Sequence, residues 1–140
     1  MKLYVSQLAW LHAAFEDKSR SMKVARLFSI KNSGGVPELP PLSCASYLLN
    51  FMHKIGFPMA SEGYVKHTEI KCWCDTQGIT LDPDEHQIIF DSFIDYNSRK
   101  AQFESDQDLA APFTTLTADQ VKYNKAMIMK SRLGSLKANV

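Results

Sequence analysis

The chain has 140 residues, of which 45% are hydrophobic and 22% are charged, and its formal net charge is +1. This balance suits one globular domain with a sizeable core and argues against a disordered tail. The charge is uneven: residues 1–31 hold six bases and two acids, residues 69–108 three bases and ten acids, and residues 117–140 five bases and one acid. Each segment is either a solvated face or part of a contact between basic ends and an acidic middle, within or between subunits. Neither interpretation implies a nucleic-acid partner.

The cysteine content and the hydropathy of the chain indicate the cellular compartment. Three cysteines, no basic-then-apolar leader and no apolar run of membrane-spanning length predict an intracellular soluble protein with reduced thiols. We therefore expect the cytoplasm, and no membrane partner.

Residues 1–31 form a predicted N-terminal helical segment. A second helix is expected to start near Ser19 to Ser21, although the break itself stays undecided. A basic amphipathic helix of this kind can lie on an anionic membrane, but core packing is the commoner explanation. The apolar stripe of the first helix has residues at i, i+4, i+7 and i+11, namely Tyr4, Leu8, Leu11 and Phe15, and the second helix would use Val24, Leu27 and Phe28.

Residues 32–41 hold two glycines and three prolines and are predicted to form a loop. Ser43 can cap the next helix, which Gly56 should end. The apolar positions of that helix are Tyr47, Leu48, Phe51, Met52 and Ile55.

Residues 69–96 predict two helices joined by a tight turn. Gly78 tolerates the positive φ of a helix C-terminus, and Asp82 suits an N-cap. Pro83 then stands at the first helical position, and the Glu85 carboxylate can reach back to the Asp82 N–H. The second helix has an apolar stripe of Ile89, Phe93 and Tyr96, widened by Ile88, Phe90 and Ile94.

Residues 114–140 hold the last predicted helix. Thr117 and Gln120 form a capping box, and Gly134 can terminate the helix. No segment alternates convincingly with a period of two, and no internal repeat is present. The sequence therefore predicts an all-α fold, a single compact domain of about five to six short helices, with residues 42–113 as its central helical unit.

The sequence gives little support for a metal site or a catalytic site. His67, Cys72 and Cys74, with Cys44 upstream, invite a zinc site. Positions i and i+2 of a helix project about 200° apart, so Cys72 and Cys74 cannot easily share one ion. The acidic residues stand at helix starts or on a polar face, where capping and solubility account for them. We expect no metal, no cofactor and no catalytic residues.

The helix–turn–helix outline of residues 69–96 also suggests DNA binding, in which the second helix would lie in the major groove. That helix instead exposes Asp84, Glu85, Asp91 and Asp95, which phosphates would repel. A nucleic-acid partner is therefore not expected.

The order of the motifs between residues 42 and 113 gives information about function. Between residues 42 and 113 an apolar helix ending in glycine precedes an E-I-x-x-W helix, a G-x-x-L-x-P-x-E turn, a helix with a late tyrosine, and an A-P-aromatic stretch. In this order the chain resembles the tail assembly chaperones of long-tailed bacteriophages over about half its length. The matching residues are Tyr47, Leu48, Met52 and Gly56; Glu69, Ile70 and Trp73; Gly78, Leu81, Pro83 and Glu85; Tyr96; and Ala111, Pro112 and Phe113.

The resemblance implies a non-enzymatic protein of the host cytoplasm that binds the tape measure protein and helps recruit tail tube subunits. Such a client needs apolar grooves between helices and many weakly binding copies, so a homo-oligomer is also expected. The alternatives are a small structural or adaptor protein of the phage virion, or a helical regulatory binding module. Candidate partner-binding residues, for which core burial is the competing explanation, are Tyr4, Leu8, Leu11, Phe15, Trp10, Phe51, Phe57 and Trp73.

Overall fold

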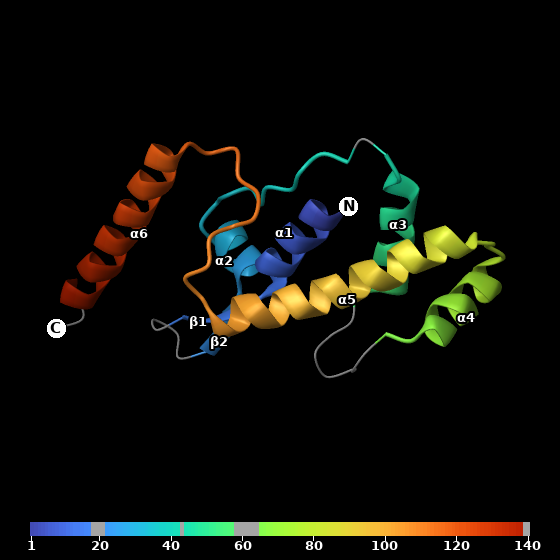
Figure 1. The fold of residues 1–140 in the computed structure, drawn as a ribbon. Helices are drawn as coiled ribbons and strands as arrows, with labels where there is room; N and C mark the ends of the chain where they lie inside the picture. Colours follow the sequence, from blue (N-terminus) through green and yellow to red (C-terminus); the bar gives the residue numbers. More distant parts are fainter. Residues whose placement is uncertain (18–21, 43, 58–64, 139–140) are drawn as a thin grey trace.

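The computed structural model describes residues 1–17, 22–42, 44–57 and 65–138. These residues form six helices and one two-stranded antiparallel sheet, so the predicted, predominantly helical fold is confirmed (Figure 1). None of the helices described is both long and apolar enough to cross a membrane. The elements are α1 (Lys2–His12), β1 (Ala14–Asp17), β2 (Met22–Ala25), α2 (Arg26–Asn32), α3 (Ser46–Ile55), α4 (His67–Gln77), α5 (Pro83–Ser105) and α6 (Ala118–Ala138).

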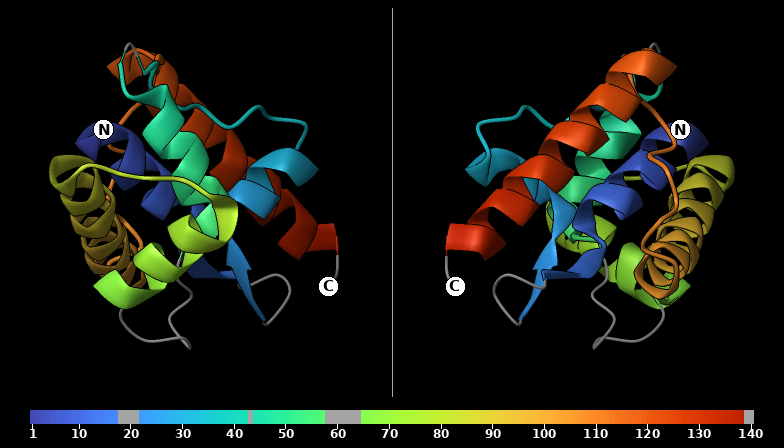
Figure 2. Two further views of the ribbon diagram at one scale, coloured as in Figure 1. Left: turned by 90° about the vertical axis from the view of Figure 1, so that its right-hand side faces the viewer. Right: turned by 90° about the vertical axis from the view of Figure 1, so that its left-hand side faces the viewer.

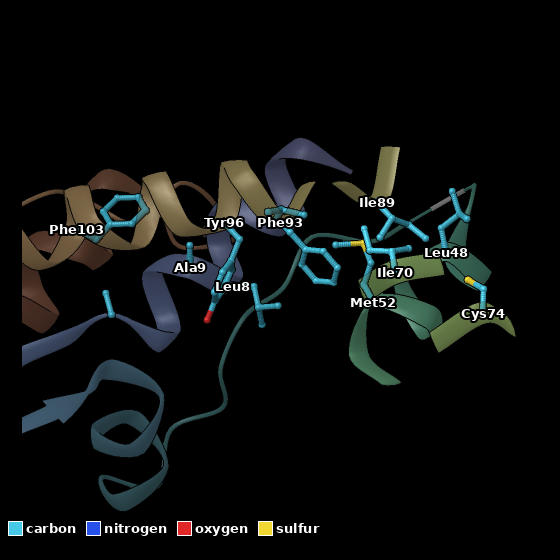
Figure 3. Packing of buried hydrophobic residues seen from close by; sticks show 12 residues of the cluster. Leu8, Ala9, Leu48, Met52, Ile70, Cys74, Ile89, Phe93, Tyr96 and Phe103 are labelled. Atoms are coloured by element: carbon cyan, nitrogen blue, oxygen red, sulfur yellow. The ribbon is translucent and has the colours of Figure 1, made fainter. Parts of the chain in front are cut away.

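The 23-residue helix α5 is the axis of the molecule. Helix α1 packs along it, α3 and α4 pack near its N-terminal half, and α1 lies between α5 and α2 in the side views (Figure 2). The core runs along one side of α5, from Ile89 and Phe93 near α3 and α4 to Tyr96 and Phe103 beside α1 (Figure 3). Burial of this apolar side is the main source of the stability of the fold.

The turn between α4 and α5 follows the prediction. Gly78 has a φ of 66°, Asp82 Oδ1 accepts from the Glu85 N–H at 2.8 Å, and the Glu85 carboxylate accepts from the Asp82 N–H at 3.0 Å. The prediction that Ile88 and Ile94 widen the buried stripe is wrong, because both side chains are 42% exposed. The buried stripe of α5 is therefore narrower than the sequence indicates.

The prediction of a second helix in residues 1–31 is wrong for the first half of that helix, which forms a strand instead. Ala13 takes extended backbone angles, and a hairpin follows in which Phe15 pairs with Val24; α2 begins only at Arg26. The hairpin depends on contacts far along the chain, since the Ala14 N–H donates to Glu104 Oε1 at 3.1 Å. The expected helix start at residues 19–21 lies outside the described residues.

Helix α3 ends at Gly56 as predicted, with a φ of 94°. The proposed cap Ser43 lies outside the described residues, and the N-cap position is taken by Ala45, which has a φ of 58°. This left-handed conformation is sterically unfavourable for alanine, unlike for glycine.

Helix α6 begins with the predicted capping box. The Thr117 N–H donates to Gln120 Oε1 at 2.9 Å, and the Gln120 N–H donates to Thr117 Oγ1 at 3.3 Å. The prediction that Gly134 ends the helix is wrong, because α6 continues to Ala138. A glycine inside a helix costs only about 1 kcal/mol relative to alanine, which a helix of this length tolerates. Figure 1 shows α6 apart from the other helices.

Candidate functional site

The apolar stripe predicted at the N-terminus is mostly core. Leu8 and Leu11 are 5% and 1% exposed, and Tyr4 is half-buried. Phe15 leaves the helical stripe because it lies on β1, where it is also half-buried. Leu8 and Leu11 are therefore not accessible to a partner in this conformation.

Trp10 belongs to a polar link around a buried arginine. The indole Nε1–H donates to the Leu109 carbonyl at 3.2 Å, and the guanidinium carbon of Arg26 lies 5.1 Å from the centre of the Trp10 ring. Arg26 donates to three carbonyl groups, those of Trp10, Phe103 and Gln107, at 3.3, 3.4 and 3.1 Å. Trp10 thus holds the end of α1 against the loop that follows α5.

A second polar link fixes the loops on either side of α1. The buried Gln7 donates through Nε2 to the Glu38 carbonyl and accepts the Phe113 N–H, each at 3.0 Å. The Glu38 carboxylate in turn accepts from the hydroxyl groups of Thr114 and Thr115, which lowers the pKa of Glu38. The base of α6 is therefore tied to the body of the protein although the helix itself stands apart.

Phe57, two residues after the end of α3, packs against α5. Its ring centre is 5.5 Å from that of Phe93 and 4.7 Å from that of Tyr96. Tyr96 also meets His12, with 2.6 Å between its hydroxyl oxygen and His12 Nδ1. Burial is the main cause that lowers the pKa of His12 and raises the pKa of Tyr96. These groups form an internal cluster and are poorly placed for a partner.

Phe51 and Trp73 are the predicted site residues that the structure brings together near the surface. Their ring centres lie 5.8 Å apart across α3 and α4, and both rings are half-buried. Tyr47, 48% exposed, lies edge-on to Phe51 at 6.1 Å, and its hydroxyl donates to the Glu85 carboxylate. We call Tyr47, Phe51 and Trp73 the aromatic surface. Tyr47 was absent from the predicted site residues, although its place in the helical pattern put it beside Phe51.

Two histidines meet on the same half of the molecule. His67 of α4 stacks on Phe90 of α5, with 3.6 Å between ring centres, and its Nδ1 lies 2.9 Å from His86 Nε2. The pair joins the first turn of α4 to the first turns of α5. The sequence reveals neither contact, because 19 positions separate the two histidines.

The thiols considered for zinc lie in different environments. Cys74 is buried in the core, whereas Cys44 and Cys72 are exposed. Within the described ranges, no three side chains of the histidine, cysteine, aspartate or glutamate type gather as a metal-binding group.

Helix α6 exposes most of its described side chains. Tyr123 and Met129 are 65% and 67% exposed, and Lys122 and Lys125 are exposed beside them. None of the described α6 side chains contributes to the core. A helix with apolar and basic groups in water is a second candidate for contacts.

Comparisons with protein-family models, curated proteins and solved structures find no match to this chain.

Proposed function

We propose that this chain is a non-enzymatic tail assembly chaperone of a long-tailed bacteriophage. It would bind the tape measure protein in the host cytoplasm during assembly and help to bring tail tube subunits to it. The proposal starts from the order of elements between residues 42 and 113, which resembles that protein class.

The observation that carries the proposal is the aromatic surface of Tyr47, Phe51 and Trp73. Two of these residues, Tyr47 and Trp73, belong to the pattern of the resemblance, and neither is enclosed in the core. Aromatic side chains that stay partly exposed offer apolar area at low entropic cost and are enriched where proteins meet. The geometry suits an apolar helical client lying across α3 and α4.

Tyr47 is the best residue with which to test the proposal, since it is the most exposed of the three. Its hydroxyl donates to Glu85, which itself caps α5, so loss of the ring and loss of the hydrogen bond must be separated. Tyr47→Phe keeps the ring and removes only the hydrogen bond. Tyr47→Ala removes both.

The experiment measures binding of the purified chain to an apolar helical segment of the tape measure protein. We expect binding by the wild-type chain and by Tyr47→Phe, and about ten-fold weaker binding by Tyr47→Ala, which corresponds to about 1.4 kcal/mol. Phe28→Ala is the matched control, because Phe28 is 52% exposed on α2, away from the aromatic surface.

Equal loss of binding by Tyr47→Ala and Phe28→Ala would mean that the aromatic surface is not the site. Absence of any binding by the wild-type chain would overturn the function itself. A chaperone should also occur in assembly lysates and be missing from finished particles, whereas a structural protein of the virion would be found in both.

A further inference from the structure

The inference concerns contact between copies of this chain and does not depend on the proposed function. It begins with one face of α6. Lys122, Lys125 and Met129 occupy positions i, i+3 and i+7, so they share one side of the helix, and all three are exposed. This basic face has an apolar group toward its C-terminal side.

The outward side of α5 has the complementary pattern. Ile88, Asp91 and Asp95 also occupy positions i, i+3 and i+7 and are exposed to water. This acidic face has its apolar group toward its N-terminal side. Among the residues that the structure describes, Asp91 and Asp95 take part in no salt bridge, and neither do Lys122 and Lys125.

The two patterns match only in one direction. When the helices run antiparallel, Met129 meets Ile88 while Lys125 and Lys122 approach Asp91 and Asp95. Along α6 the three residues are spaced by 3 and then 4 positions, whereas along α5, read in the opposite direction, they are spaced by 4 and then 3. The middle residues are therefore offset by one position, about 1.5 Å of helix rise, which a lysine side chain spans easily. A parallel arrangement would put the apolar group of each face against a charge.

The match cannot form within one copy. Figure 1 shows the first half of α5 at the opposite end of the molecule from α6. The base of α6 is held in place by the bonds from Thr114 and Thr115 to Glu38. A second copy, by contrast, offers the same acidic face without strain.

We propose that the basic face of α6 docks antiparallel on the acidic face of α5 of a second copy of this chain. Lys122 and Lys125 pair with Asp95 and Asp91, and Met129 covers Ile88. The contact is small and partly electrostatic, so it assembles weakly and its strength falls as salt rises.

The test exchanges the charges of the two faces in separate full-length chains. In Lys122→Glu/Lys125→Glu both faces are acidic, and in Asp91→Lys/Asp95→Lys both are basic. At about 0.1 M salt, where the screening length is about 10 Å, sedimentation should show association of the wild-type chain. Each exchanged chain alone should associate at least ten-fold more weakly. An equimolar mixture should regain association, because each variant then supplies the face that the other lacks.

Lys2→Glu/Lys54→Glu is the matched control, since it changes the net charge equally at exposed positions of α1 and α3. It should associate like the wild-type chain. Circular dichroism checks that each chain is folded. If Lys122→Glu/Lys125→Glu does not fold, Lys122→Gln/Lys125→Gln is used in its place. A wild-type chain that stays monomeric, exchanged chains that associate normally, or a mixture that stays dissociated would each overturn the proposal.

Discussion

At the scale of single residues, Arg26 is the most demanding group in the structure. Its guanidinium is buried, and its hydrogen bonds go to three backbone carbonyls that come from α1, α5 and the loop after α5. Desolvation lowers the pKa of Arg26, and the nearby Glu104 carboxylate opposes that shift. The guanidinium also lies over the Trp10 ring and donates to three carbonyls at once, so the site suits arginine and not lysine.

Arg26→Lys should therefore destabilise the protein although it keeps the charge. A single ammonium group cannot reach all three carbonyls, so at least one buried acceptor loses its donor, at a cost of about 1–3 kcal/mol. Urea unfolding measures the change. Arg99→Lys is the control, because Arg99 is exposed on α5 and donates only to the Gln102 side chain, at 3.3 Å. Equal midpoints for the two variants would contradict the structural role of Arg26.

At the scale of elements, α6 differs from the other helices. The core cluster draws side chains from α1, α3, α4 and α5, and the described side chains of α6 add none to it. Its N-terminal capping box and the contacts of Glu38 with Thr114 and Thr115 hold the start of the helix. Its helicity thus depends on local hydrogen bonds and capping more than on packing.

Removal of residues 118–140 should leave the remaining domain folded. We expect the midpoint of thermal unfolding to change by no more than about 2–4 °C, because no described core contact is lost and about 1 kcal/mol shifts the midpoint of a domain of this size by a few degrees. The helical signal should fall in proportion to the missing helix. A truncated chain that is molten or insoluble would show that α6 covers part of the core.

The elements that the sequence predicts well are those defined by neighbouring residues. The capping boxes at Asp82–Glu85 and Thr117–Gln120 each need only four residues, so the starts of α5 and α6 can be predicted. The hairpin between α1 and α2 cannot, because its strands have four residues each and are held by Glu104, some 90 positions away. Short-range periodicity does not contain that information.

The candidate site shows the same limit. Phe51 and Trp73 could be selected as aromatic positions, but their meeting depends on how α3 and α4 pack. Leu8 and Leu11 have an equally suitable pattern and are buried. Helical spacing tells which residues share a face, whereas only the packing shows whether that face is covered.

At the scale of the whole molecule, α1 and α5 hold distant parts of the chain together. Arg26 and Glu104 link the hairpin region to the end of α5, and Gln7 links the loops that lead to α3 and α6. His12 and Tyr96 connect the two central helices directly, through a hydrogen bond whose histidine partner is half-buried and can become charged. Protonation of His12 therefore makes the packing of α1 on α5 depend on pH.

Stability should fall on mild acidification because of His12. Burial, aided by the charges of Lys100 and His53, lowers the pKa of His12 from 6.5, so the unfolded chain binds a proton more readily than the folded one. The stabilisation is complete above 6.5 and is lost as the pH falls through the lower pKa of the folded state. The lowered pKa of Glu38 acts in the same direction only at more acidic pH, since its ordinary value is 4.5.

Urea unfolding of the wild-type chain and His12→Asn between about pH 7 and about pH 5 tests this coupling. Asparagine keeps an acceptor for the Tyr96 hydroxyl but does not titrate, so the variant should lose less stability over the interval than the wild-type chain. His53→Asn is the control, since His53 is exposed on α3 and its charge is the smallest of the three causes acting on His12. It should keep most of the wild-type slope. If His12→Asn and the wild-type chain lose stability in parallel, the His12–Tyr96 pair is not what makes the packing of α1 on α5 depend on pH.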